Sequence, residues 1–140
     1  MEGKLFDPLR QKEVAATPEE TVRQRTISWL NEDRGIPLSM MASEYSFRFN
    51  GMLYRADIVV FGRDRSPLML VECKAPSVTL GKDVLYQVIR YNRVLGVRFI
   101  MITNGRNMYL CGKAGDGNEY AFLSDLPDFG RYLKNRESGW

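Results

Sequence analysis

The sequence predicts an α/β sandwich in which helices flank one mixed central sheet. Three observations lead to this prediction. A helix-start signal lies near residue 17, three strand-like segments follow it between short polar turns, and a second amphipathic segment precedes two more strand-like segments. The expected order is α-β-β-β-α-β-β with a tail, which favours a mixed sheet over an all-parallel one.

The first helix is expected from Thr17 to about Asn31. Thr17 is a suitable N-cap, Pro18 suits the first helical position, and Glu20 stands where the glutamate of a capping box belongs. Apolar residues recur along the segment until Gly35 and the proline after it break the pattern.

Three strands should follow the first helix. The segments share a high content of aromatic, β-branched and aliphatic residues, and they are Glu44–Phe49, Tyr54–Phe61 and Pro67–Cys73. Asn50-Gly51 separates the first two, and a polar turn over residues 62–66 separates the last two. The three segments therefore predict an antiparallel meander.

A second helix and a further set of strands complete the expected fold. The helix runs from Lys82 to about Leu95, where Gly96 ends it. The remaining expected elements are strands at Arg98–Thr103, Asn107–Cys111 and Tyr120–Leu123 and a weaker terminal helix at Asp125–Arg136.

Composition indicates one domain over residues 1–140. An apolar content of 44% against 26% charged residues is ordinary for a soluble domain, and no linker divides the chain. We expect residues 1–16 to be a mobile segment ahead of the domain. The charged N-terminus and the lack of a long apolar run predict a cytoplasmic protein with no membrane contact.

The chain contains no histidine, which narrows the possible chemistry. Ser-His-Asp and Cys-His catalysis and His-ligated zinc are excluded, and no phosphate-binding P-loop motif is present. Cys73 and Cys111 lie in apolar stretches and are expected to be buried, reduced thiols. Chemistry must therefore use Asp, Glu, Lys or Tyr, and the net charge of +3 permits a polyanionic partner.

Two carboxylates and a lysine are expected to converge on the second hairpin. If its turn is centred between Asp64 and Arg65, Asp57 lies opposite Glu72, with Cβ atoms about 4.5 to 5.5 Å apart. Lys74 shares the face because it is two residues beyond Glu72. Two carboxylates about 5 Å apart repel by roughly 3 kcal/mol at an effective dielectric constant near 20, so the pair favours a cation between them.

A magnesium ion fits this arrangement. Magnesium takes oxygen ligands and is typically held by one or two carboxylates, so Asp57 and Glu72 are candidate ligands, with the backbone carbonyl of Cys73 as a third. Mn²⁺ could substitute for it. Lys74 could then orient a water molecule or balance charge on a phosphate. The alternative is a surface ion cluster, but both carboxylates adjoin apolar runs typical of buried strands, where unpaired charge is costly.

These residues carry a resemblance to a known family. The strings at residues 55–60 and 70–76 resemble the N-terminal nuclease domain of type I restriction enzyme R subunits, which belongs to the PD-(D/E)xK nuclease superfamily. The resemblance extends from residues 17–24 through Gln87 and Tyr91 to Thr103-Asn104-Gly105, and it implies a restriction-endonuclease-like fold. Ala56 stands where the name of the superfamily has proline, and no motor motif is present.

The resemblance also implies roles for three further residues. Glu20 would help to hold a water molecule or a second ion, although its position equally suits a capping box. Gln87 and Tyr91 are four residues apart on the second helix and would orient Lys74 or touch a phosphate. For Tyr91 the alternative is core packing. The scattered arginines, Arg23 and Arg55 among them, could contact phosphates, although such arginines are usually solvated surface.

The predicted function is a Mg²⁺-dependent endodeoxyribonuclease of the restriction type, with DNA as its partner. Two alternatives stay open at this point, a structure-selective repair nuclease and a nucleic-acid-binding accessory module without turnover. Other restriction-system subunits or a second copy of the chain could be further partners. The residues do not distinguish DNA from RNA.

Overall fold

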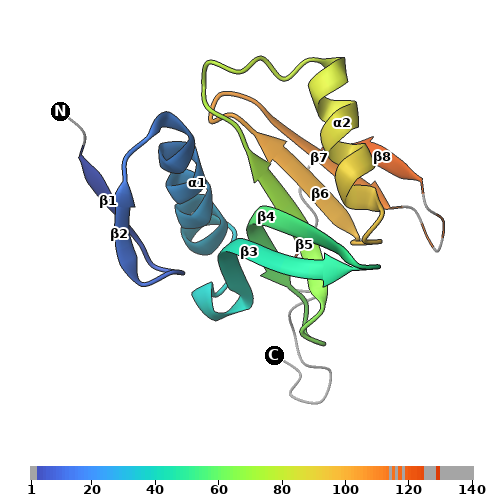
Figure 1. The fold of residues 1–140 in the computed structure, drawn as a ribbon, viewed down its shortest axis with the longest axis horizontal. Coiled ribbons are helices and arrows are strands. Elements are labelled where there is room, and N and C mark those ends of the chain that lie inside the picture. The colour runs from blue at the N-terminus through green and yellow to red at the C-terminus, as the bar shows by residue number, and fades with distance from the viewer. Residues whose placement is uncertain (1–2, 114, 116, 118, 125–128, 130–140) are drawn as a thin grey trace.

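The chain folds into a sheet with one helix on each face and a small hairpin outside the first helix. The structure is a computed structural model and describes residues 3–113, 115, 117, 119–124 and 129. In Figure 1, α1 lies between the N-terminal hairpin and the sheet, and α2 lies across the sheet strands that follow it in the chain. No helix among the described residues is long and apolar enough to cross a membrane.

The sheet has six strands in the order β3-β4-β5-β6-β7-β8. Its strands are β3 Met41–Phe49, β4 Met52–Phe61, β5 Pro67–Cys73, β6 Phe99–Thr103, β7 Met108–Lys113 and β8 Tyr120–Leu123. Among the described strands only β5 and β6 pair in parallel, because α2 carries the chain across between them, so the sheet is mixed. The predicted order and the restriction-endonuclease-like fold class are confirmed, while the helix expected at 125–136 lies outside the described residues, Phe129 excepted.

The helices begin where the sequence predicts. α1 spans Pro18–Ser28 and continues as one π-helical turn, Trp29–Asp33, a 3₁₀ turn spans Leu38–Met40, and α2 spans Lys82–Arg93. The Thr17 side chain accepts a hydrogen bond from the Glu20 backbone N–H at 3.1 Å, which confirms the N-cap.

The other half of the expected capping box is wrong. The carboxylate of Glu20 does not return to the cap but accepts hydrogen bonds from Arg10 and Gln24, both at 2.9 Å. A charged guanidinium is a stronger donor than a backbone amide, so Arg10 draws the side chain away from Thr17.

An N-terminal hairpin was not predicted from the sequence. β1 (Lys4–Asp7) pairs with β2 (Lys12–Ala15) where we expected a mobile segment. The fully buried Asp7 fixes the turn, because its carboxylate accepts the backbone N–H of Leu9 at 2.7 Å and pairs with Arg10. Strands of four residues give too short a pattern to be recognised by periodicity.

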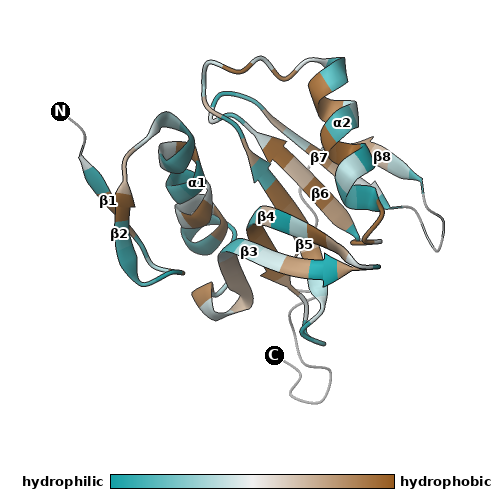
Figure 2. Ribbon diagram, viewed as in Figure 1, coloured by the Kyte–Doolittle hydropathy of each residue, from teal (hydrophilic) through white to brown (hydrophobic). Residues whose placement is uncertain are grey.

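Two apolar clusters lie on opposite faces of the sheet. The α1 cluster includes Val22 and Ile27 with Val71 of β5, and the α2 cluster includes Val88 with Leu70 of β5. Figure 2 shows the corresponding band of hydrophobic residues along β5 and β6. Both cysteines are buried and free, as predicted.

The hairpin of β3 and β4 changes sides part of the way along its length. Ala56 belongs to the α2 cluster and Ile58 to the α1 cluster, although residues two apart on a regular strand share a face. On β3, Met41 and Tyr45 are divided in the same way. The regular pairing is interrupted at Glu44, whose φ of 52° is in the left-handed region. Both strands therefore bend together beside Asp57.

The contact between Gly105 and α1 gives a test of the packing. Gly105 has φ of 88°, and a Cβ atom there would lie 3.2 Å from Cγ2 of Val22. Gly35 has φ of 74° with nothing within 4 Å of such an atom. We expect Gly35→Ala to lower the free energy of unfolding by about 1 kcal/mol through backbone strain alone. Gly105→Ala should cost roughly twice that, because α1 must also move. Urea denaturation measures both, and equal losses would show that Gly105 and α1 are not in tight contact.

Candidate active site

The two predicted carboxylates lie where the pairing of β4 with β5 ends. The last paired residues are Ile58 and Val71, and continuing the same register places Asp57 opposite Glu72, as the sequence predicts. The register near the turn differs from the prediction, because a shift after Val60 places Phe61 opposite Pro67 instead of Leu68. A bulge at the turn therefore leaves the register at the carboxylates unchanged.

Asp57 is fixed by the backbone of the neighbouring strand. Its Oδ2 accepts the backbone N–H of Cys73 at 2.7 Å, so the side chain bridges β4 to β5 beyond the last backbone pair. Its Oδ1 lies 3.7 Å from Nη2 of Arg23 on α1. The carboxylate is therefore held between the sheet and the first helix.

Glu72 and Lys74 lie on the same side at the end of β5. Nζ of Lys74 is 3.3 Å from Oε2 of Glu72, and both side chains are about one-third exposed or less, at 31% and 27%. The Lys74 backbone N–H donates to the carbonyl of Thr103 at 2.8 Å, which ties this residue to the end of β6. The lysine is thus anchored at its backbone, and its amine is held beside Glu72.

Burial makes both carboxylates reluctant to ionise. The pKa of Asp57 is raised by burial, although the Cys73 N–H and the charges of Arg23 and Lys74 oppose the shift. The pKa of Glu72 is raised first by burial and then by the negative charge of Asp57. Burial therefore disfavours both charges, and the charge of Asp57 further disfavours that of Glu72.

Arg23 is a site residue that the sequence analysis assigned to the surface. It is only 6% exposed, its Nη2 faces Asp57, and its Nη1 lies 3.3 Å from Oε2 of Glu44. Its Nε lies 3.5 Å from Oε2 of Glu20 without hydrogen-bond geometry, and it has no hydrogen-bond partner among the described residues. An arginine on a helix gives no signal of burial in the sequence, so only the structure could find this role.

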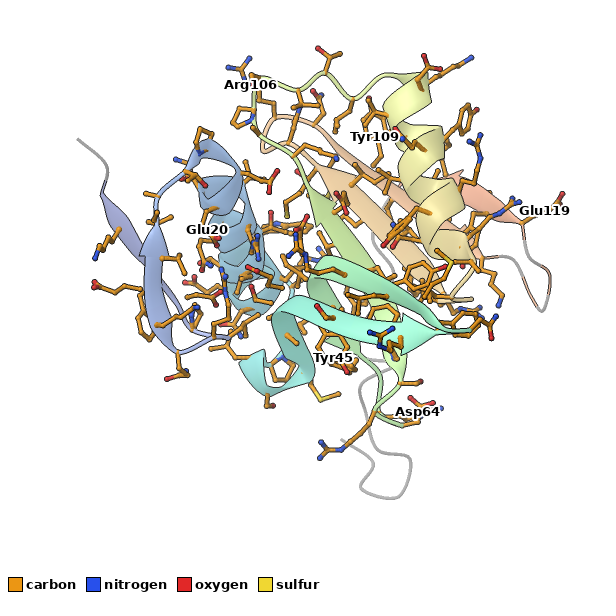
Figure 3. The ribbon with its side chains drawn as sticks, in the orientation of Figure 1. Glu20, Tyr45, Asp64, Arg106, Tyr109 and Glu119 are labelled. Carbon is orange, nitrogen blue, oxygen red and sulfur yellow. The ribbon has the colours of Figure 1, made fainter. Side chains whose placement is uncertain are left out.

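Glu20 lies in the same charged network but not at the carboxylate pair. Its contacts are with Arg10, Gln24 and Arg23, and Figure 3 shows it on α1, between the N-terminal hairpin and the sheet. The first-turn glutamate whose charge raises the pKa of Glu72 is Glu19, which is exposed.

Gln87 and Tyr91 lie on α2. Gln87 is exposed, and the ring of Tyr91 lies 5.1 Å from the ring of Tyr54 on β4 with 45% of the residue exposed. In the part of the chain that the structure describes, neither side chain is hydrogen-bonded to Lys74. The implied role of orienting Lys74 stays a prediction, and the packing alternative for Tyr91 accounts for its ring contact.

Asn104 supports the site from the end of β6. This residue is 3% exposed, and its side-chain amide donates to the carbonyl of Val78 at 2.8 Å. Its carbonyl oxygen accepts the backbone N–H groups of Arg106 and Asn107. Asn104 thus ties the segment after Lys74 to the β6–β7 turn, which explains in physical terms why the Thr-Asn-Gly string accompanies the lysine.

The donor set is suited to a hard divalent cation. Asp57 and Glu72 offer carboxylate oxygens, and the pKa of Glu72 is raised by burial and by the negative charge of Asp57, so a cation would favour its ionised form. Within residues 3–113 and the other described positions, no three Asp, Glu, Cys or His side chains gather into a metal-binding group. Magnesium commonly uses one or two carboxylates, so the pair fits the ion. Burial raises the pKa of the Cys73 thiol, which keeps its sulfur protonated and unsuitable as a ligand.

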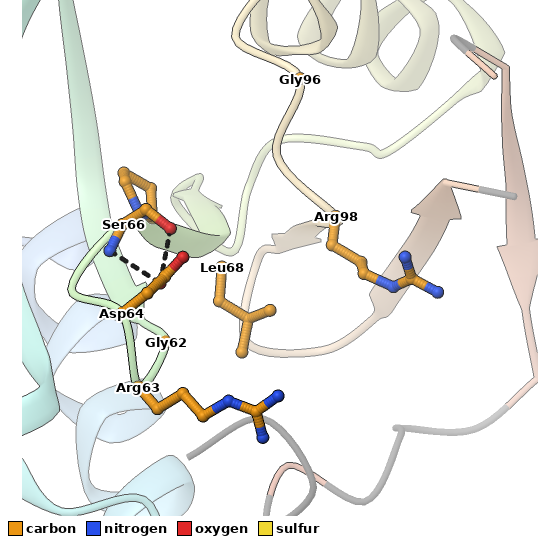
Figure 4. A pocket seen from close by; sticks show the side chains of 8 residues that line it. Gly62, Arg63, Asp64, Ser66, Leu68, Gly96 and Arg98 are labelled. Atoms are coloured by element: carbon orange, nitrogen blue, oxygen red, sulfur yellow. Dashed lines mark hydrogen bonds between the residues drawn. The ribbon is translucent and has the colours of Figure 1, made fainter. Parts of the chain in front are cut away.

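A hollow elsewhere on the surface does not coincide with these residues. It has a volume of about 310 Å³ and lies at the β4–β5 turn, where its lining includes Asp64, Leu68 and Arg98 (Figure 4). This turn precedes β5, whereas Glu72 lies near the far end of that strand. The hollow is therefore separate from the candidate site.

Comparisons with known proteins agree with this fold. The family model described as type I restriction enzyme R protein N terminus (HSDR_N) matches residues 18–127. A solved fragment of a proposed HsdR subunit of a type I restriction enzyme from Vibrio vulnificus aligns with a TM-score of 0.55 and 22% identity, over 81% of this chain and 24% of that one. The chain thus spans about a quarter of the length of that solved fragment.

A second solved structure shows the same fold. It is a proposed nuclease of the DUF820 group from Anabaena variabilis, with a TM-score of 0.55 and 13% identity over 94% of this chain and 86% of that one. Among curated proteins no match is found.

The raised pKa of Glu72 predicts how stability depends on pH. The folded protein binds this proton more tightly than the unfolded chain, so the contribution of Glu72 to stability is greatest below the ordinary glutamate pKa of about 4.3. It falls as pH rises through the higher pKa of the folded state. We therefore expect Glu72→Gln to raise the free energy of unfolding at pH 7 by about 1 kcal/mol.

Urea denaturation measures this effect. It should be carried out at about pH 4 to pH 8, a range that includes the titration of buried carboxyl groups. Glu13→Gln on β2 is the matched control, because Glu13 is exposed and should leave stability unchanged. A stability loss at pH 7 in Glu72→Gln would contradict the prediction.

Proposed function

The chain belongs to the family of type I restriction enzyme R protein N termini, and we propose that it hydrolyses phosphodiester bonds of DNA with the help of a divalent metal ion. Family membership and the fold support a nuclease-like domain. Metal dependence, turnover and the choice of DNA are the proposed parts.

One observation carries the proposal. Asp57 and Glu72 are neighbouring, partly buried carboxylates at the open end of the β4–β5 pairing, and the Lys74 amine lies 3.3 Å from Glu72. Without a bound cation such a pair lowers the stability of the folded protein. Burial opposes the ionisation of both carboxylates, and the charge of Asp57 also opposes that of Glu72. Binding of a cation, which the proposed reaction on a phosphate group requires, would offset this cost in free energy.

Each residue has a distinct part in the proposed reaction. Asp57 and Glu72 would hold Mg²⁺ or Mn²⁺, with the Cys73 carbonyl as a further candidate ligand. When bound, the ion would supply Lewis-acid polarisation of the scissile phosphate. Lys74 would orient a water molecule for attack and balance negative charge that develops on the phosphate oxygens. Arg23 would keep Asp57 in place through its buried guanidinium.

The family also suggests a setting for the reaction. The match to an R-protein N terminus supports a role within a restriction system, and we propose that other subunits of such a system are partners of this chain. A second copy of the chain is the alternative partner.

Metal binding should stabilise the folded protein. Because an ion that binds only the folded state adds RT ln(1 + [L]/Kd), Mg²⁺ or Mn²⁺ at about ten times its Kd should add roughly 1.4 kcal/mol. Asp57→Ala and Glu72→Ala should fold and lose this gain, whereas Glu13→Gln should keep it. Thermal melts with and without metal, together with titration calorimetry, measure both quantities. Unchanged metal affinity in the two site variants would leave the carboxylates as a plain ion cluster.

Lys74→Ala separates a nuclease from a module that only binds nucleic acid. We expect it to lower the cleavage rate by at least about a hundredfold, since it removes charge needed in the transition state, while metal binding persists. DNA affinity should fall only slightly, because one phosphate contact is a small part of the total. Lys82→Ala, an exposed lysine at the start of α2, is the control.

The measurement is cleavage of plasmid, single-stranded and branched DNA in Mg²⁺ and in Mn²⁺. Wild type that binds DNA without cutting it in either metal would establish the accessory module instead. Preference for branched DNA would favour a repair nuclease, and Lys74→Ala that cuts as fast as wild type would refute the role of the lysine.

A further inference from the structure

Half of the β3–β4 hairpin forms a two-stranded arm. β4 pairs with β5 only from Ile58 onward, whereas β3 and β4 continue to pair with each other out to Phe49 and Met52. We call residues 45–56 the hairpin arm. The arm begins directly beside Asp57, so whatever binds to it also lies next to the candidate site.

One face of the arm is already covered. Tyr45, Phe47 and Tyr54 form a row of ring contacts that continues to Phe61 and to Tyr91 of α2, with centroids 5.1 to 6.0 Å apart. The contacts hold the arm against α2 and the sheet. Tyr54 is buried, and Tyr45 and Phe47 are partly buried, so these rings are engaged within the protein.

The opposite face carries arginines. By the alternation of a strand, Ser46, Arg48, Leu53 and Arg55 share this side, and the pairings of Arg48 with Leu53 and of Ser46 with Arg55 place them in two adjacent rows. We call these four residues the arginine face. Arg48 is exposed, and the side chain of Arg55 is 67% exposed.

The charge of the arm is entirely positive. Residues 45–56 include two arginines and no acidic residue. Within the described part of the chain Arg48 forms no ion pair, and Arg55 has only Glu44, with Nη1 3.8 Å from Oε1. Arg48 is therefore not neutralised by the described residues, and the ion pair of Arg55 is long and exposed, so both guanidinium groups can meet anionic groups from outside.

The tip of the arm is apolar and exposed. Asn50 and Gly51 both have positive φ, 51° and 78°, which is the pattern of a tight two-residue hairpin turn. Beside the turn, Met52 and Leu53 are 60% and 58% exposed. These side chains leave apolar surface at the tip that a partner could cover.

We propose that the arginine face is a docking surface for double-stranded DNA, with Arg48 and Arg55 on phosphates and the apolar tip in a groove. A two-stranded ribbon fits the major groove, and apolar side chains at a protein tip can pack against base steps. The arm would lead the duplex to the carboxylates at its base. This inference rests on the proposed function, whose substrate class it narrows.

Duplex DNA is favoured over a single strand by the direction of the rings. Proteins that bind single strands offer outward aromatic side chains on which bases stack. Here the rings of Tyr45, Phe47 and Tyr54 are engaged with one another and with α2. The exposed side offers guanidinium groups and aliphatic carbon, which suit phosphates and groove walls.

The test measures DNA binding apart from cleavage. Fluorescence anisotropy in EDTA gives the Kd of a short duplex and of its single strands at several salt concentrations. We expect wild type to prefer the duplex, and Arg48→Glu to weaken duplex binding about tenfold and to reduce the slope of log Kd against log salt by about 1. Arg25→Glu is the matched control: it makes the same change in net charge at an exposed arginine on α1, and it should alter Kd less than about threefold.

A second variant tests the tip. Leu53→Ser should weaken duplex binding by about threefold or more without changing the salt slope, since it removes an apolar contact and no charge. Circular dichroism checks that all variants fold.

The outcomes separate this inference from the proposed function. Arg48→Glu that binds as tightly as wild type, a preference for single strands, or no DNA binding by wild type would overturn the docking surface. Wild type that binds duplex DNA through Arg48 but cleaves nothing would overturn the proposed nuclease activity and leave the docking surface standing.

Discussion

The structure is organised around the partial burial of two like charges, Asp57 and Glu72. Two carboxylates about 5 Å apart repel by roughly 3 kcal/mol at an effective dielectric constant near 20, and burial adds to the cost. Specific neighbouring groups reduce this free-energy cost. The Cys73 N–H and Arg23 act on Asp57, and Lys74 acts on both carboxylates. Burial still raises the pKa of both groups, so the pair favours an additional cation.

The bend of the β3–β4 hairpin makes this arrangement possible. In a regular strand Ala56 and Ile58 would share one face, and Asp57 would lie on the opposite face. The Asp57 side chain would then point away either from α1 or from the arm. The interruption opposite Glu44 turns the strand at Asp57, so that its carboxylate reaches the backbone of β5 and the side chain of Arg23 together. Glu44 adopts a left-handed backbone conformation that is unfavourable for most side chains, and its ion pairs with Arg10 and Arg23 offset that strain.

The strand register was predictable because it depends on local patterning. The apolar runs of β4 and β5 and the short turn between them fix the pairing, so the position of Asp57 opposite Glu72 follows from sequence even though a bulge alters the turn. Long-range ion pairs leave no such pattern. Glu20 matched a capping box perfectly by spacing, yet Arg10, ten residues earlier, determines where its carboxylate points. In the sequence Arg23 resembles an ordinary surface arginine, and its burial is evident only from the packing of α1 against the sheet.

The charge balance of the network gives a last argument for a cation at its end. The ion pairs that surround Asp57, together with the Glu72–Lys74 pair beside it, join five carboxylates to four cations. These are Asp7, Glu20, Glu44, Asp57 and Glu72 on one side and Arg10, Arg23, Arg55 and Lys74 on the other. The surplus is one negative charge, and Asp57 and Glu72 lie at the end of this network. The proposed divalent ion would reverse the surplus to one positive charge, which is the charge that a single phosphodiester group neutralises. On this accounting the N-terminal hairpin contributes to the site through Asp7 and Arg10, although it lies on the far side of α1.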